Sequence, residues 1–277
     1  MGEATLKAGF KTAGRRLRSL DSRLEKVQFL TGNALKLIAV FTMVVDHTCK
    51  IVLQWLLINH WGVMVDHGQM SWEQFQKIDN LIRFDLQSIG TVAFPLFCFL
   101  LSEGFRHTRN RPRYIGSMIL FAFLSELPFD IGFFSAYSTM EGTFPFYLRY
   151  QNVFFTLSLG LLTLVCLERF SRSSRSGSGK IGLVFLQVLS IAFFALLAEL
   201  IRCDYGMQGI CFIAAFYICR GHRIGQVLLF LLAYMGTTGN QPPLCTLLAC
   251  LLILLYNGQR GKFKLKYCFY AFYPIQS

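Results

Sequence analysis

The stretch LKLIAVFTMVVDHTCK, residues 35–50, combines a long apolar run with Asp46, His47 and Lys50 at its end. It lies within an apolar segment, residues 32–57, that is long enough to cross a bilayer, since a helical crossing needs about 20 residues. Charged groups inside such a segment are costly in lipid, so their presence indicates a packing or functional role. The stretch therefore predicts a membrane-spanning helix that carries a polar site.

The composition extends this prediction to the whole chain of 277 residues. Hydrophobic residues make up 54% of it and charged residues only 15%, whereas soluble domains average about 25% charged residues. The mean hydropathy is +0.47. So few polar residues could not cover the surface of a soluble protein, which excludes a soluble enzyme, a disordered chain and a fibrous one. We predict an all-α, polytopic transmembrane helix bundle with about 8–9 spans.

Apolar runs separated by short polar breaks give the predicted spans. They cover residues 32–57, 87–105, 114–135, 152–169, 181–200, 205–219, 224–237 and 242–256. Residues 58–86 are predicted to form an outer loop, and residues 171–180 (SRSSRSGSGK) a flexible linker. A ninth apolar piece, residues 267–275, is too short to cross. We divide the chain into a basic amphipathic segment, residues 1–30, and a transmembrane domain, residues 31–277.

The net charge of +12, from 27 Lys and Arg against 15 Asp and Glu, would suggest nucleic acid in a soluble protein. With the N-terminus in the cytoplasm, 21 basic residues fall in predicted cytoplasmic segments. The predicted outer segments hold Lys77, Arg83, Arg149 and Arg202. Because membrane proteins concentrate basic residues in cytoplasmic loops, the charge orients the chain. We expect a multi-pass protein of the cell (inner or plasma) membrane, with the lipid bilayer as a partner and no nucleic acid.

The nine cysteines are scattered through apolar stretches and form no C-x-x-C pair. Their number is odd and their spacing fits no metal framework. We interpret them as small buried hydrophobic residues and expect no metal site.

Within the first span, Lys36 and His47 are predicted to share one face of the helix. They are eleven residues apart in sequence, which corresponds to about 1,100° of rotation and places them on the same side about 16 Å apart. Lys50 extends the same stripe, and Asp46 can pair with Lys50 at i, i+4. Four polar groups on one span favour a functional site. The alternative is an internally paired patch that fixes helix packing.

Arg106 and Arg109 lie three residues apart at the predicted cytoplasmic end of the second span. At this spacing two guanidinium groups can bind one anion together. The alternative is ordinary positive charge of a cytoplasmic loop, which orients the protein and binds nothing.

Glu126 and Asp130 in the third span, and Asn152 at the start of the fourth, are predicted to lie toward the outer face. Other polar residues expected at the same level are Arg149, Tyr150, Gln151, Glu199, Arg202, Cys203 and Asp204. These residues predict either the rim of an outward-facing polar site or a set of interfacial pairs that close the ends of the bundle.

Together these groups outline a polar path across the membrane, with cations at the cytoplasmic mouth and a histidine beside a carboxylate within. Such a path suits a group-transfer enzyme with an anionic cytoplasmic donor and an outer acceptor. It equally suits a transporter or flippase of a small anion or lipid-linked group, without acyl chemistry. A non-enzymatic membrane scaffold is a third possibility. We find no clear internal repeat, which weighs against a transporter.

Six segments of the sequence are similar to the TraX family and occur in the family's order. They are LKLIAVFTMVVDHTCK (35–50), IGTVAFPLFCFLLSEGFRHTRNRPRY (89–114), LFAFLSELPFDIGF (120–133), QNVFFTLSLGLL (151–162), DYGMQGICFIAAFY (204–217) and KYCFYAFYP (266–274). Polar residues match along with the apolar ones. After Pro274 three residues follow, where family members usually continue into a further spanning helix.

The resemblance implies an acyltransferase that uses acetyl-CoA, since the family's best-known member acetylates the N-terminus of a conjugative pilin in the inner membrane. The family in turn resembles a wider superfamily of membrane acyltransferases. Many of its members carry a basic residue, ten intervening residues and a histidine in the first span, and Lys36 and His47 have this spacing. An R-x-x-R pair is also frequent there, and Arg106 to Arg109 fits it.

We therefore predict that Lys36, Arg106 and Arg109 bind the phosphates of coenzyme A, since guanidinium forks match phosphate oxygens. His47 is predicted to act as general base or as transient acyl carrier. Asp46 would set its tautomer or its pKa.

The acceptor is expected at the outer face, as a pilin-like peptide N-terminus or a surface glycan. Glu126, Asp130 and Asn152 are predicted to position it.

Overall fold

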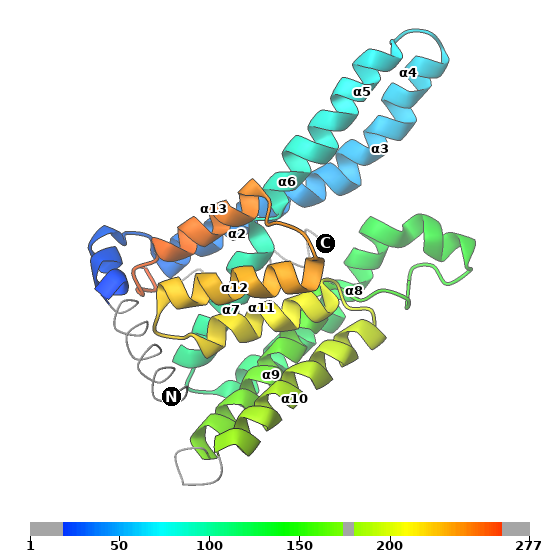
Figure 1. Cartoon of the computed structure of the whole chain (residues 1–277). Coiled ribbons are helices and arrows are strands. Elements are labelled where there is room, and N and C mark those ends of the chain that lie inside the picture. The colour runs from blue at the N-terminus through cyan, green and yellow to red at the C-terminus, as the bar shows by residue number, and fades with distance from the viewer. Residues whose placement is uncertain (1–18, 174–179, 262–277) are drawn as a thin grey trace.

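The computed structural model describes residues 19–173 and 180–261. Apart from two isolated β-bridges, every regular element in these ranges is helical (Figure 1). Among the described residues, five helical segments are long and apolar enough to cross a membrane, and α11 (Gly206–Ile218) and α13 (Leu244–Leu254) are shorter apolar helices. The prediction of an all-α membrane helix bundle is confirmed. The predicted piece at residues 267–275 and most of the N-terminal segment lie outside the described residues.

The first two spans are longer than predicted and form one long hairpin. The outgoing arm runs through α2 (Gly32–His47), α3 (Gln54–Leu56) and α4 (Val63–Asp66), joined by wide π-helical turns. The returning arm runs through α5 (Trp72–Asn80), α6 (Gln87–Gly90) and α7 (Ala93–His107). The segment from α3 to α6 projects beyond the other helices (Figure 1).

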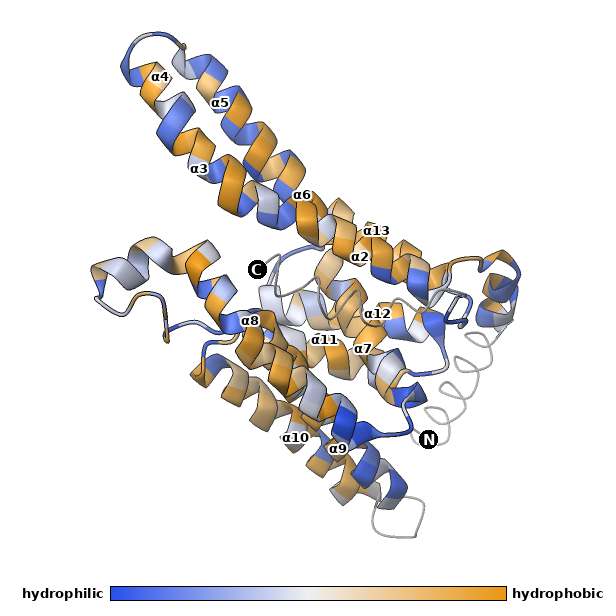
Figure 2. Cartoon of the chain, turned by 180° about the vertical axis from the view of Figure 1, so that it is seen from behind, coloured by the Kyte–Doolittle hydropathy of each residue, from blue (hydrophilic) through white to orange (hydrophobic). Residues whose placement is uncertain are grey.

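The prediction of an outer loop over residues 58–86 is therefore wrong. Cys49, Leu57 and Ile82 are buried and form a small apolar core between the two arms. Ser71 starts the returning arm with a capping box, in which its hydroxyl and Gln74 satisfy each other's backbone N–H groups. Apolar and polar residues alternate along the arms (Figure 2), so a search for uninterrupted apolar runs passes over these helices.

The other helices agree closely with the predicted spans. They are α8 (Arg111–Met140), α9 (Val153–Ser173), α10 (Lys180–Leu200), α11, α12 (Arg223–Thr238) and α13. The predicted linker lies largely outside the described residues. Successive helices run in opposite directions, so helix ends gather at two levels of the bundle.

The centre of the bundle is built on α7, α9 and α11. Phe99, Leu161 and Phe216 are fully buried there. Gly160 faces Ile213 so closely that any side chain at position 160 would overlap it. Small residues at such crossings let membrane helices approach closely.

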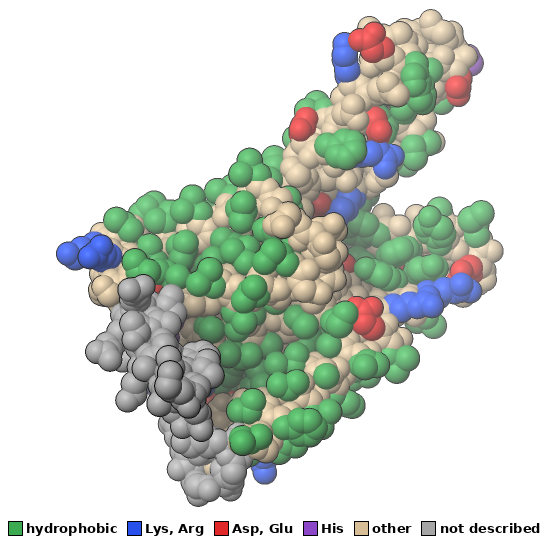
Figure 3. Space-filling view, in the orientation of Figure 1, with side chains coloured by type: hydrophobic (Ala, Val, Ile, Leu, Met, Phe, Trp, Pro, Cys, Tyr) green, Lys and Arg blue, Asp and Glu red, His purple; other side chains and the backbone are tan. Residues whose placement is uncertain are grey.

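The outer surface of the bundle is apolar between the two levels of helix ends. On α10, Ile181, Phe185, Leu196 and Leu200 all expose most of their side chains. Hydrophobic side chains cover much of the visible face of α10 and α12, whereas charged side chains lie on the hairpin and near helix ends (Figure 3). Such a surface suits contact with lipid.

One level, which we call the basic end, contains the start of α2, α8 and α12 and the end of α7 and α9. Glu103 is buried there and accepts a hydrogen bond from Arg223 Nη2 at 3.3 Å. Arg111 and Glu168 pair through two hydrogen bonds that join α8 to α9. We call the opposite level the cavity end.

Candidate functional site

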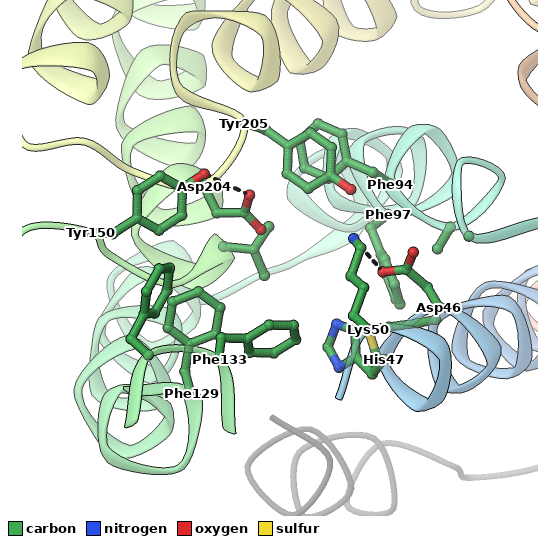
Figure 4. A pocket seen from close by; sticks show the side chains of 15 residues that line it. Asp46, His47, Lys50, Phe94, Phe97, Phe129, Phe133, Tyr150, Asp204 and Tyr205 are labelled. Atoms are coloured by element: carbon green, nitrogen blue, oxygen red, sulfur yellow. Dashed lines mark hydrogen bonds and ion pairs between the residues drawn. The ribbon is translucent and has the colours of Figure 1, made fainter. Parts of the chain in front are cut away.

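A cavity of about 230 Å³ lies at the cavity end, between α2, α7, α8 and the segments that precede α9 and α11 (Figure 4). Its polar lining consists of Asp46, His47, Lys50, Tyr150, Asp204 and Tyr205. Its aromatic lining consists of Phe94, Phe97, Phe129, Phe133 and Phe134. Because drug-sized ligands occupy about 300–1,000 Å³, this cavity admits a small group or the tip of a longer molecule.

The predicted ion pair on α2 is present. Lys50 Nζ lies 2.7 Å from Asp46 Oδ2, and Lys50 belongs to the first π-helical turn after α2. A Cβ on Gly90 would come within 2.5 Å of Asp46 Oδ1. Only glycine at this position therefore lets α6 lie so close to the carboxylate.

His47 lies beside Lys50 at the same wall of the cavity, and Phe133 points toward it from α8 (Figure 4). The two rings meet edge to face, with their centroids 5.2 Å apart. The imidazole is half-buried. A histidine in this setting can exchange a proton with a small group inside the cavity while aromatic rings limit the access of water.

Tyr150 and Asp204 form the facing wall. The Tyr150 hydroxyl donates to Asp204 Oδ1 at 3.2 Å. Asp204 lies in the turn between α10 and α11, where its N–H donates to the carbonyl of Gln151 at 2.8 Å and its own carbonyl accepts from Thr156. These bonds hold the carboxyl group toward the Asp46–Lys50 pair.

Asp204 is the group in this wall that can change charge near neutral pH. Burial raises its pKa to about 6, and the charge of Lys50 opposes that rise. Burial and the neighbouring Asp204 carboxylate raise the pKa of the Tyr150 phenol, so Tyr150 stays protonated and donates.

Tyr205 closes the cavity on the side of α7. Its backbone has a left-handed φ of 61°, and its ring stacks on Phe94 with 3.5 Å between centroids. The turn is held from α10, because Glu199 Oε1 accepts from Met207 N at 2.7 Å. The segment DYG, residues 204–206, therefore places two side chains in the site.

The predicted acceptor residues lie behind the cavity wall, and none of them is part of the lining. Asn152 Nδ2 donates to the carbonyl of Ala122 at 2.8 Å and to Glu126. Asp130 is fully buried and accepts from Tyr147 N at 2.9 Å. These bonds hold the segment that carries Tyr150 against α8.

The predicted cofactor residues lie at the basic end. Arg106 is exposed, with Nη1 at 4.0 Å from Glu103 Oε1. Arg109 is exposed in the turn between α7 and α8. Lys36 is half-buried one turn into α2, about 16 Å along the helix axis from His47. The structure therefore separates the predicted phosphate-binding cations from the predicted catalytic pair.

Sequence reasoning assigned Asp46 and His47 to the site but gave no specific role to Tyr150 and Asp204. Both had been expected at an outer rim. Tyr150 lies just before α9 and Asp204 just before α11. A parallel β-bridge between Gln151 and Cys203 brings these two helix starts together. Within residues 19–173 and 180–261, no group of three or more His, Cys, Asp or Glu side chains could hold a metal ion.

Comparisons with known proteins agree on one relationship. A family model described as "TraX protein" matches residues 31–276. A curated relative from Dichelobacter nodosus, "Probable fimbrial assembly protein FimC, serogroup H1", is 30% identical over 258 residues, which cover 87% of this chain and 90% of the relative. No solved structure matches the chain.

Proposed function

The chain belongs to the TraX family, and on this premise we propose that it is a membrane acyltransferase that moves an acetyl group from cytoplasmic acetyl-CoA to an acceptor at the outer face. We place it in the inner or plasma membrane, with residues 1–30 in the cytoplasm. The name of the relative concerns fimbrial assembly, which supports a pilin-like peptide N-terminus as acceptor. A surface glycan is the other acceptor class of this proposal.

The observation that carries the proposal is His47 inside a small, aromatic-walled cavity with a lysine beside it and a carboxyl group opposite. His47 takes the proton of the acceptor amine or hydroxyl while that group attacks the acyl carbonyl carbon. The new C–N or C–O bond forms, the C–S bond breaks, and the sulfur leaves with the proton that His47 returns. The Lys50 ammonium group, which lines the same cavity, would stabilise the developing oxyanion.

The size of the cavity decides where the rest of coenzyme A would lie. About 230 Å³ has room for the thioester tip and the attacking group, and the nucleotide must stay outside. Lys36, Arg106 and Arg109 at the basic end would bind its phosphates. The thioester arm would follow the face of α2 between them, past Met43, which lines the cavity.

This face of α2 also bears on the transporter hypothesis. Val40 and Met43 occupy the positions between Lys36 and His47 on the helix face, and both are apolar. They offer no ligand to an ion or to a hydrated anion in transit. The absence of polar groups at these two positions weighs against a transport path along this face.

The test uses the full chain reconstituted in vesicles with labelled acetyl-CoA and an acceptor peptide. We expect His47→Ala to lower the transfer of label about 100-fold or more. His67→Ala is the matched control, since His67 is exposed at the tip of the hairpin and should leave transfer unchanged. Undiminished transfer by the His47→Ala variant would overturn the proposal.

A further inference from the structure

A second hollow, of about 670 Å³, lies beside the first cavity and opens to the outside of the bundle. It is lined by Leu148, Arg149, Gln151, Phe155, Leu200, Ile201 and Arg202. These residues come from the end of α10, the start of α9 and the turns next to them.

The hollow and the first cavity share one wall. Gln151 N donates to the carbonyl of Arg202 at 3.0 Å, and Asp204 N donates to the carbonyl of Gln151 at 2.8 Å. Tyr150 and Asp204 line the inner cavity, whereas Gln151 and Arg202 beside them line the outer hollow.

The hollow holds an arginine whose charge is not neutralised by an acid. Among the basic residues predicted on the outer side, Lys77, Arg83 and Arg149 each pair with a carboxylate. Arg202 has no acidic partner within 4.0 Å among the residues that the structure describes, and its side chain is exposed. It therefore offers a guanidinium group to an external anion.

The backbone of Arg202 adds a second observation. Its φ of 53° lies in the left-handed region, which is unfavourable for a residue that carries a side chain. Glycine would occupy this position without strain. The chain nonetheless carries an arginine there, and this strained residue is part of the lining of the hollow.

Apolar side chains flank the guanidinium group. Leu148 and Leu200 are 77% and 78% exposed, and Phe155 forms part of the floor. Leu200 also ends the apolar row of α10 that faces lipid. The hollow thus places a cation where the apolar surface of the bundle ends, which is the level of lipid head groups.

We propose that this hollow binds one anionic phospholipid of the outer leaflet, with the head-group phosphate on Arg202 and the acyl chains along Leu148 and Leu200. The shape supplies a pocket for the head group, and the charge supplies selectivity for an anion. The proposal does not depend on acyl transfer, because none of the lining residues of the hollow takes part in it.

The test measures lipid binding by native mass spectrometry of the full chain in neutral detergent. Phosphatidylglycerol, phosphatidylcholine and soluble glycerol phosphate are titrated in separate series. We expect phosphatidylglycerol to bind in preference to the other two. Arg202→Gly should weaken this binding by about tenfold, since a charged hydrogen bond is lost.

Arg202→Gly is chosen because it removes the guanidinium group and relieves the backbone strain at the same time. The variant should melt at the same temperature as the parent or higher, so that loss of binding is not loss of folding. Arg83→Gln is the matched control on the hairpin and should keep full binding. Equal binding of the two phospholipids, full binding by Arg202→Gly, or equal binding of glycerol phosphate would each overturn the proposal.

Discussion

The two ends of the bundle hold charged groups in different ways. At the cavity end, Asp46, Lys50 and Asp204 line a small aromatic-walled cavity, where Asp46 and Lys50 are paired and both act on the charge of Asp204. At the basic end, many cations lie at the surface, and Arg106 and Arg109 are exposed. Solvent and salt screen exposed charges but affect enclosed ones much less. The comparison teaches that the cavity end is suited to chemistry and the basic end to binding an anion.

The largest expected contrast between the two ends is kinetic. His47→Ala should lower kcat about 100-fold or more, since a general base contributes about 10²–10⁴-fold, and should change KM for acetyl-CoA little. Arg106→Gln combined with Arg109→Gln should raise this KM about tenfold through the loss of charged hydrogen bonds, with kcat kept.

Steady-state kinetics at two salt concentrations check this contrast. Added salt should raise KM of the parent and have a smaller effect on the double variant, because the screened charges are gone. If the KM of the double variant equals that of the parent, Arg106 and Arg109 do not bind the cofactor. Their charges would then serve only to orient the protein in the membrane.

A second prediction concerns the pH dependence of stability at the cavity end. Asp204 has a pKa of about 6 when folded and about 3.9 when unfolded, so between these values the folded state binds more protons. Stability should therefore be greatest below pH 4 as far as this group is concerned. It should fall by about 2–3 kcal/mol as the pH rises through 6.

Asp204→Asn isolates this contribution, because an amide oxygen still accepts the hydrogen bond of Tyr150 but carries no charge. Thermal unfolding in detergent is followed from about pH 4.5 to about pH 7.5, a range that brackets the pKa of Asp204. The unfolding midpoint of the parent should fall as the pH rises, and that of the variant should change less. Parallel profiles would mean that Asp204 is not the titrating group.

The third and smallest prediction compares two helical glycines. Gly90→Ala should destabilise the protein by about 1–3 kcal/mol, the usual cost of overpacking, because the new methyl group would meet Asp46. Gly116→Ala on α8 meets nothing within 4 Å and should stabilise by up to about 1 kcal/mol through helix propensity. Thermal unfolding of both variants measures the difference, and equal midpoints would show that the approach of α6 to Asp46 is loose.

The sequence allowed the helices of the bundle to be predicted within a few residues, because continuous apolar runs and basic breaks are local signals. The pairing of Asp46 with Lys50 was also predictable, since i, i+4 geometry needs only one helix. The outer parts of the two hairpin arms were not predictable, because their apolar residues are spaced among polar ones. They become a core only when the two arms meet.

The site was predicted in part for the same reason. Asp46 and His47 lie on one helix, so a single stretch of sequence reveals them. Tyr150 and Asp204 come together only through the bridge between two distant turns, which no local pattern contains. Asn152 is equally polar and close in sequence to Tyr150, yet its side chain turns away from the cavity, and that direction is set by tertiary packing.

The π-helical turn at Thr48–Leu53 has a consequence for the phase of the first arm. Such a turn contains more residues than an α-helical turn does. It therefore accommodates one additional residue while the helix stays continuous. Each residue of an α-helix advances its faces by about 100°. Removing one residue from this turn would leave the arm helical and keep His47 in place, but it would rotate everything beyond it. The rotation of the arm about its own axis, rather than its length, thus decides which face of the hairpin is turned toward the cavity.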